Sequence, residues 1–251
     1  MKKFFLLIII SIIFFSNSCK DSPKTLGLYW EQSTLQIHPN GDSSIIFQKH
    51  YLIPNKYKRE MSSYVGNNFI IIRMDKDIMI RGNIDDSTYT EVPFSEIEKR
   101  NNIHKENIRR MRAQMDTLSP RLRAFMEMDM GVRWIPENYK LVETGEKQKI
   151  LKLNCEKFLI TDNDSLIGEY WLTNDLGNMN DYSKDWIAIL EKVLTGTAFD
   201  RYKLLYERGI LIKSQTRRAT IEIQKIEKTD IPENLFDPPS DYTKLEYKVR
   251  Q

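Results

Sequence analysis

Reactive side chains are scarce in this sequence of 251 residues. It contains two cysteines, Cys19 and Cys155, and three widely separated histidines, His38, His50 and His104. No HExxH motif, no Cys–His pair at ligand spacing and no Gly-x-Ser-x-Gly elbow is present. These absences argue against a zinc site and against an acyl-transfer triad. We therefore expect no catalytic residue, no metal and no cofactor.

The first nineteen residues have the pattern of an export signal. Lys2 and Lys3 form a positive head, followed by an apolar run over residues 4–15 that only Ser11 interrupts. A membrane-spanning helix needs about 20 apolar residues, so this run is too short for one. Residues 1–18 are therefore predicted to be a signal peptide.

The residues around Cys19 resemble a bacterial lipobox. Ser16, Asn17 and Ser18 precede the cysteine, although Ser16 stands where leucine is usual. The pattern predicts cleavage between Ser18 and Cys19 and attachment of diacylglycerol to the Cys19 sulfur. The alternative is an ordinary secretory signal with an incidental cysteine.

A lipidated Cys19 would attach the mature chain to membrane lipid, since each buried methylene contributes about 0.8 kcal/mol. Residues 19–26 are then a polar tether, and residues 27–251 form a single domain. Lys20 follows the cysteine where aspartate would favour inner-membrane retention. The expected location is the outer membrane of a bacterial envelope, facing the periplasm; Lys20-Asp21 leaves surface exposure open.

The charge of the mature chain is balanced. Removing residues 1–18 takes away two lysines and no acidic residue, so the formal net charge falls from +3 to +1. No basic face is implied, which argues against nucleic acid as a partner. With Cys19 acylated, Cys155 has no disulfide partner and is expected to be buried or, failing that, paired with another molecule.

Short strands with turn signals between them dominate the first part of the domain. Successive extended segments separated by turns favour an antiparallel sheet. The expected strands are 27–37, 43–53, 69–72, 78–80 and 88–92.

Helical spacing replaces this pattern in the middle of the chain. Ser95 and Glu98 fit a capping box, which predicts a helix beginning there. Ser119-Pro120 predicts a second helix, and the two helices together cover residues 95–130. Their apolar residues are the candidate walls of a ligand cavity, or else ordinary core over the sheet: Ile108, Met111, Met115, Leu118, Phe125 and Met126.

Strand character returns over residues 139–173 and again in a hairpin over 209–227, with a last strand near 242–247. Between them, residues 184–207 are predicted to be helical, with Trp186, Ile189, Leu190 and Val193 on one face.

Two charged groups have simpler explanations than a binding site. Asp162, Asp164 and Asp175 lack the glycine and glutamate of an EF-hand loop, so turn chemistry explains them better than calcium binding. Residues 109, 110 and 112 are arginines and are expected to face solvent; contact with anionic lipid heads is the alternative.

Several short motifs follow one another in order along the mature chain: Gly27-Leu28-Tyr29-Trp30-Glu31, Gln48-Lys49-His50-Tyr51-Leu52, Ile72-Arg73-Met74-Asp75-Lys76, Thr88-Tyr89-Thr90-Glu91, Cys155-Glu156-Lys157-Phe158, Glu169-Tyr170-Trp171-Leu172-Thr173, and Leu235-Phe236. This order resembles a family of bacterial lipoprotein domains of unknown function. That family is similar in architecture to the LolA/LolB-type lipoprotein carriers. The resemblance implies an α+β fold: an antiparallel, strongly curved, unclosed β-barrel (a half-barrel) with helices packed against its concave face.

Three hypotheses for the function follow. The first is a non-catalytic lipoprotein that binds a lipid or another hydrophobic ligand in the half-barrel cavity. The second is an envelope module that docks another protein, which a filled interior and an exposed apolar patch on the convex face would favour. The third is an enzyme, which needs a cleft with converging polar groups.

Overall fold

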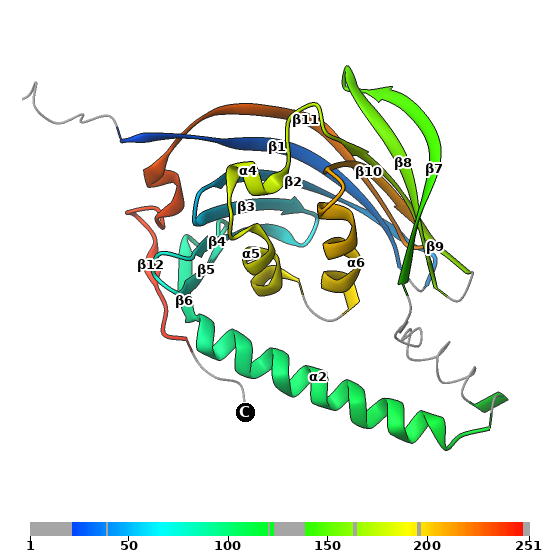
Figure 1. Ribbon diagram of the computed structural model, residues 1–251. Helices are drawn as coiled ribbons and strands as arrows, with labels where there is room; N and C mark the ends of the chain where they lie inside the picture. Colours follow the sequence, from blue (N-terminus) through cyan, green and yellow to red (C-terminus); the bar gives the residue numbers. More distant parts are fainter. Residues whose placement is uncertain are drawn as a thin grey trace, which may run out of the picture.

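The computed structural model describes residues 22–38, 40–119, 121–122, 139–162, 165–194 and 197–247. The first half of the domain is a meander in which each strand pairs with the next (Figure 1). Its strands are β1 (Lys24–Ile37), β2 (Ser43–Ile53), β3 (Lys56–Ser63), β4 (Gly66–Arg73), β5 (Ile78–Asn83) and β6 (Thr88–Pro93).

The second half contains the helices and a second series of strands. One long helix follows β6, and three short helices lie between β9 and β10. The elements are α2 (Phe94–Asp116), β7 (Tyr139–Ile150), β8 (Leu153–Asp162), β9 (Ser165–Thr173), α4 (Met179–Tyr182), α5 (Trp186–Val193), α6 (Thr197–Tyr206), β10 (Ile210–Thr216), β11 (Ala219–Pro232), the 3₁₀ helix η1 (Glu233–Phe236) and β12 (Thr243–Lys244).

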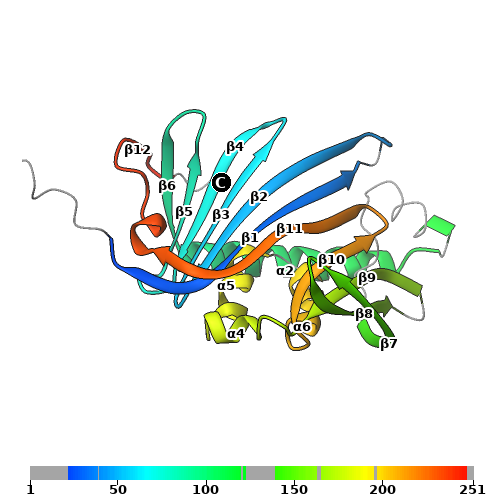
Figure 2. The same ribbon diagram turned by 90° about the horizontal axis from the view of Figure 1, so that it is seen from above.

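All of these strands belong to one 12-stranded sheet in the order β12-β6-β5-β4-β3-β2-β1-β11-β10-β9-β8-β7. The pairings are antiparallel except the short parallel pairing of β12 with β6. Antiparallel pairing of β1 with β11 joins the two series of strands. The sheet curves strongly without closing, and α4, α5 and α6 lie inside the curve (Figures 1 and 2). The predicted α+β half-barrel is therefore confirmed.

Strand β3 is absent from the sequence prediction, which has no strand between Pro54 and Phe69. Four of its eight residues are charged, so it lacks the apolar pattern of a strand. It forms because β2 and β4 pair with it on both sides. Tyr57 is buried on one face, and on the other the Lys58 ammonium lies 5.6 Å from the centre of the Phe69 ring.

The concave face of the sheet carries the larger core. Leu28, Trp30 and Leu52 of the sheet pack there in one cluster with residues of α5. The predicted apolar face of this helix is confirmed for Trp186, Ile189 and Leu190, which are buried; the side chain of Val193 lies outside the description. The helices thus occupy the inside of the half-barrel.

A smaller core lies on the convex face near the start of β1. The C-terminal segment from η1 to β12 covers it, with Phe236 fully buried. Arg73 fixes this segment: its guanidinium donates to both carboxylate oxygens of Asp75, to the Phe236 carbonyl at 3.3 Å and to Asp237 at 2.5 Å. The rest of the convex face has no such cover from the described residues.

Helix α2 begins at Phe94, one residue before the predicted Ser95. Phe94 and Ile97 in its first turns are buried, whereas Ile103 is exposed. The second predicted helix falls largely on residues 123–138, which lie outside the described residues. Within the described ranges, no helix has the length and apolar character to cross a membrane.

Candidate functional site

An aromatic-lined cavity lies between the concave sheet and α5–α6. Trp30 of β1, Tyr57 of β3, Trp186 of α5 and Tyr206 of α6 all line it. The Trp186 ring packs edge-on against the other three, with centroid distances of 6.3, 5.5 and 5.5 Å to Trp30, Tyr57 and Tyr206. Four aromatic rings from four elements therefore enclose one space.

This cavity is small. Its volume is about 100 Å³, whereas pockets for drug-sized ligands usually span about 300–1,000 Å³. Helices α5 and α6 pack their apolar residues on this part of the concave sheet, which is the surface that a large ligand would use. As far as the described residues go, this cavity has no room for a complete lipid.

Two hydrogen-bond donors at this cavity lack partners. Arg59 Nε and Trp186 Nε1 are buried atoms, and neither meets an acceptor among the described residues. Buried donors are nearly always paired in folded proteins. The two therefore mark a part of the cavity wall where an acceptor is missing.

Several other polar groups near the cavity are paired, although the buried His50 Nε2 has no partner among the described residues. Tyr57 hydroxyl and His50 Nδ1 are 2.8 Å apart, and Gln32 accepts from Trp30 Nε1 at 3.3 Å while donating to Gln48 at 2.5 Å. Burial raises the pKa of Tyr57 to about 12, so its hydroxyl stays protonated at neutral pH.

The cavity residues predicted from the sequence belong to a different segment of the chain from these aromatic residues. None of the cavity-lining residues comes from the described part of α2. Met111 and Leu118 are partly buried; the side chains of Ile108 and Met115, and the whole of Phe125 and Met126, lie outside the description. The role of this stripe stays a prediction. The aromatic residues that do line the cavity come from segments far apart in the sequence, and no local pattern connects them.

A second feature is an apolar patch on the convex face at the far end of β1 and β2. Leu35 lies directly opposite Ile45 in the register, with Ile37 and Phe47 two residues along on either strand. These four side chains, the distal patch, are 40, 51, 44 and 59% exposed in that order. Single exposed apolar residues are common, but four neighbours on one face are not.

The neighbouring hairpin tip is also apolar. Tyr64 and Val65, in the turn between β3 and β4, are 78% and 75% exposed. Asp85, in the turn between β5 and β6, accepts hydrogen bonds from the backbone and side-chain nitrogens of Asn67, both at 2.8 Å. The tip is thus held in a defined position although its apolar side chains face solvent.

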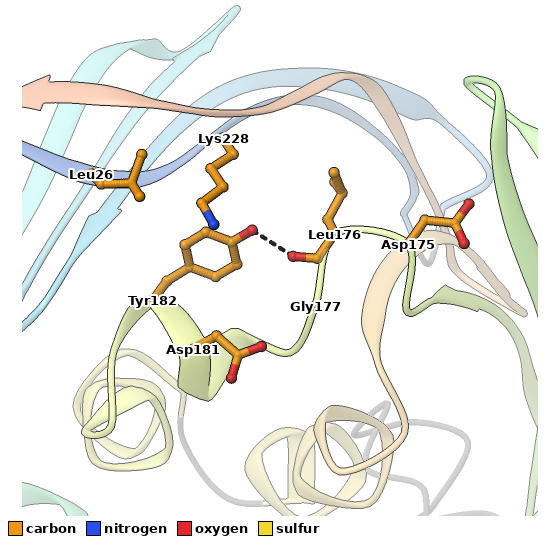
Figure 3. A pocket seen from close by; sticks show the side chains of 7 residues that line it. All are labelled: Leu26, Asp175, Leu176, Gly177, Asp181, Tyr182 and Lys228. Carbon is orange, nitrogen blue, oxygen red and sulfur yellow. Dashed lines mark hydrogen bonds between the residues drawn. The ribbon is translucent and has the colours of Figure 1, made fainter.

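A surface hollow of about 470 Å³ lies beside α4 (Figure 3). Tyr182 hydroxyl donates to the Leu176 carbonyl at 2.5 Å, and the Lys228 ammonium lies 5.7 Å from the centre of the Tyr182 ring. Asp181 accepts from the Asn178 backbone in a capping box. Local contacts therefore account for Asp181, in the capping box, and for Lys228, at the Tyr182 ring.

The remaining predicted groups have structural roles. Cys155 is buried as expected, and burial raises the pKa of its thiol. Asp175 accepts from the Asn154 backbone and side chain, in line with a loop-stabilising role. Arg109 and Arg110 are exposed and pair with Glu106, whereas the Arg112 side chain and Asp164 lie outside the description.

Asp162 ends β8, and one of its carboxylate oxygens is buried without a hydrogen-bond partner among the described residues. His38 contacts Ser44, His50 lies in β2 and His104 in α2. The described part of the chain holds no group of three or more potential metal ligands.

Comparisons with known proteins identify a family without identifying an activity. A family model described as a domain of unknown function, DUF4412, matches residues 108–242, more than half of the chain. No curated protein sequence matches significantly.

Among solved structures, similarity extends over most of the chain at low sequence identity. An uncharacterised conserved protein from Thermus thermophilus has a TM-score of 0.43 at 8% identity, covering 88% of this chain and 91% of its own. PNGF-II has a TM-score of 0.37 at 12% identity, covering 90% of this chain and 32% of its own. MucB in complex with MucA(peri) has a TM-score of 0.37 at 9% identity, covering 87% and 56%.

Proposed function

This chain belongs to the DUF4412 family of domains of unknown function, and we propose that it is a non-catalytic, lipid-anchored envelope protein whose distal patch docks a partner protein. The observation that carries the proposal is the contrast between the two faces of the sheet. Under α5 and α6 the concave side is filled down to a cavity of about 100 Å³, while Leu35, Ile45 and Phe47 lie exposed on the convex side.

The patch lies at the far end of β1 from Lys24, and the proposed anchor precedes Lys24 in the sequence. A strand rises about 3.3 Å per residue, so Leu35 is roughly 35 Å along the strand from Lys24. Strand β1 begins at Lys24, within the predicted tether of residues 19–26. The part of the tether before it, from Cys19 to Pro23, adds at most about 17 Å when fully extended. With Cys19 in the outer membrane, this geometry favours a patch held away from the anchoring bilayer. A protein in the periplasm is therefore the occupant we propose, in preference to lipid.

Carriage of a whole lipid fits the described interior less well. A LolA/LolB-type carrier needs a cavity that shelters acyl chains, and the aromatic cavity under α5 and α6 is suited only to a small group. An enzyme needs converging reactive groups, and two of the three tyrosines that line the described cavity, Tyr57 and Tyr206, have a pKa raised by burial. Neither observation favours catalysis.

The proposal is tested by placing a photo-crosslinking amino acid at position 47 in the full chain and irradiating intact cells. We expect one discrete protein adduct. An excess of purified mature domain should compete with it, whereas the same domain carrying Ile45→Ser and Phe47→Ser should not. The matched control is a crosslinker at Leu166, which is 52% exposed on β9, away from the patch.

Three outcomes would overturn the proposal. They are adducts with lipid, adducts with a second copy of the chain, and a crosslink to a segment of the same chain. Equal competition by the domain carrying Ile45→Ser and Phe47→Ser would also contradict it, because binding would then not depend on the apolar patch. This double variant must keep the melting temperature of the parent for the comparison to count; replacing two exposed residues is expected to change stability little.

A further inference from the structure

The concave face of β1–β6 carries positive charge without any carboxylate to balance it. Side chains alternate between the two faces of a strand, and the register places Trp30, His50, Tyr57, Ile72 and Met79 on the concave side. Apart from the exposed Lys24 at the start of β1, the charged residues sharing that side are two arginines, Arg59 and Arg81. The acidic residues of the six strands, Glu31, Glu60 and Glu91, alternate onto the convex side.

Arg59 and Arg81 flank the same residue. Ile70 of β4 lies opposite Arg59 of β3 on one side and opposite Arg81 of β5 on the other. Two strand spacings separate their backbones by about 10 Å, a distance that two long side chains can close. The pKa of the Arg81 guanidinium is lowered by partial burial and then by the nearby charges of Arg100 and Arg59.

On the convex face, by contrast, several cationic side chains are paired with carboxylates. Arg73 is paired with Asp75 and Asp237, Lys56 with Glu233 and Lys58 with Glu60. Among the described residues, Arg59 has no ion pair, and the hydrogen bond of Arg81 goes to the thioether of Met79 at 3.1 Å. Arg59 is half-buried and Arg81 is exposed. A carboxylate or phosphate is the partner that an unpaired guanidinium prefers.

Arg59 also lines the aromatic cavity, where its Nε and the Trp186 Nε1 lack acceptors among the described residues. We propose that this cavity binds a small anionic amphiphile. Its short apolar body lies among Trp30, Tyr57 and Trp186, and its carboxylate or phosphate head accepts hydrogen bonds from Arg59 with Arg81 beside it.

The volume limits the size of the apolar body. A cavity of about 150 Å³ lined by apolar side chains holds benzene, so the space of about 100 Å³ here takes a short or slender group. A longer apolar chain on the ligand would extend out of the cavity. This site lies on the face opposite the distal patch and does not depend on the proposed docking.

Tryptophan fluorescence and calorimetric titration of the mature domain test the proposal, because Trp30 and Trp186 both line the cavity. The probes are hexanoate, hexyl phosphate, 1-hexanol and hexylammonium at matched ionic strength, with acetate as the head group without a body. We expect hexanoate or hexyl phosphate to bind at least about tenfold more tightly than hexanol. The preferred anion distinguishes a carboxylate from a phosphate ligand.

Arg59→Gln should abolish the preference for the anion, and Arg59→Lys should restore part of it. Arg218→Gln is the matched control, since Arg218 is an exposed arginine outside the cavity. Trp186→Phe keeps most of the ring and removes the N–H group, so it should weaken binding with the fold intact, as near-ultraviolet circular dichroism would check.

Equal affinity for hexanol and hexanoate would overturn the proposal, because the cavity would then be merely apolar. Equal effects of Arg59→Gln and Arg218→Gln would mean that binding depends only on surface charge. Competition by acetate as strong as that by hexanoate would mean the same. Absence of binding by every anion at tens of millimolar would also refute it.

Discussion

Trp30 stacks on His50, with ring centroids 4.5 Å apart and ring planes inclined by 7°. The two residues lie directly opposite each other on β1 and β2. His50 is only 4% exposed, and burial, with a further contribution from the charge of Arg59, lowers the pKa of its imidazole well below the usual 6.5. The stacked ring is therefore neutral in the folded protein.

This neutrality predicts a loss of stability in acid. Because the folded-state pKa lies below the unfolded one, protonation favours the unfolded chain, and stability falls as the pH drops below about 6.5. The slope from this one residue is about 1.4 kcal/mol per pH unit. Urea unfolding between pH 7.5 and pH 5 should show it. His50→Gln should flatten the profile, whereas His104→Gln, at an exposed position of α2, should leave it unchanged.

Gly82 is required for the packing of Phe69. A Cβ atom at position 82 would lie 2.0 Å from Phe69 Cε1. The ring has little freedom to move, since Lys58 and Tyr242 pack against it. Gly82→Ala should therefore destabilise the domain by about 1–3 kcal/mol, the usual cost of overpacking.

A double-mutant cycle with Phe69→Leu checks this mechanism. If the clash with the ring is the cause, Gly82→Ala should cost much less when Phe69 is already leucine. If the losses of stability from the two substitutions simply add, the effect of Gly82→Ala comes from the strand backbone instead.

Arg73 is predicted to hold the C-terminal segment on the convex face. It is 6% exposed and reaches both Asp237 and the Phe236 carbonyl. Arg73→Met keeps the apolar stem but removes these charge-assisted hydrogen bonds, each of which contributes about 1.5–3 kcal/mol. Limited proteolysis should then cleave sooner after η1. Lys76→Met is the control. The Lys76 ammonium lies 3.6 Å from a carboxylate oxygen of the same Asp237, but the Lys76 side chain is exposed. Equal protection in both variants would contradict this role.

Cys19→Ser should release the chain from membranes. The proposed acyl chains on Cys19 provide the binding energy of the anchor, and the predicted tether contributes little. Fractionation of cells followed by mass spectrometry of the N-terminal peptide measures both localisation and acylation. Cys155→Ala removes the other thiol and should leave the protein in the membrane fraction. A Cys19→Ser protein that stays in the pellet without acyl chains would refute the anchor.

Local patterns in the sequence were sufficient for much of the secondary structure. Turn residues such as Asp85 and Asp86, followed by alternating segments, marked most of the strands of the first meander. The spacing of Trp186, Ile189 and Leu190 identified the buried face of α5. These features depend on neighbours within one strand or one helical turn, so the chain itself contains the information.

Strand β3 and the two candidate sites were decided by tertiary structure. The charged residues of β3 form a strand only because β2 and β4 pair with it. Trp30 and Trp186 line one cavity because β1 and α5 meet across the concave sheet. Alternation along a strand separates Ile45 from Ile46, but it does not tell which face curves inward. The pairing of β1 with β11 and the position of the helices determine which face is concave. As a result, Arg59 lies on the face that the helices cover, and Phe47 is exposed to solvent.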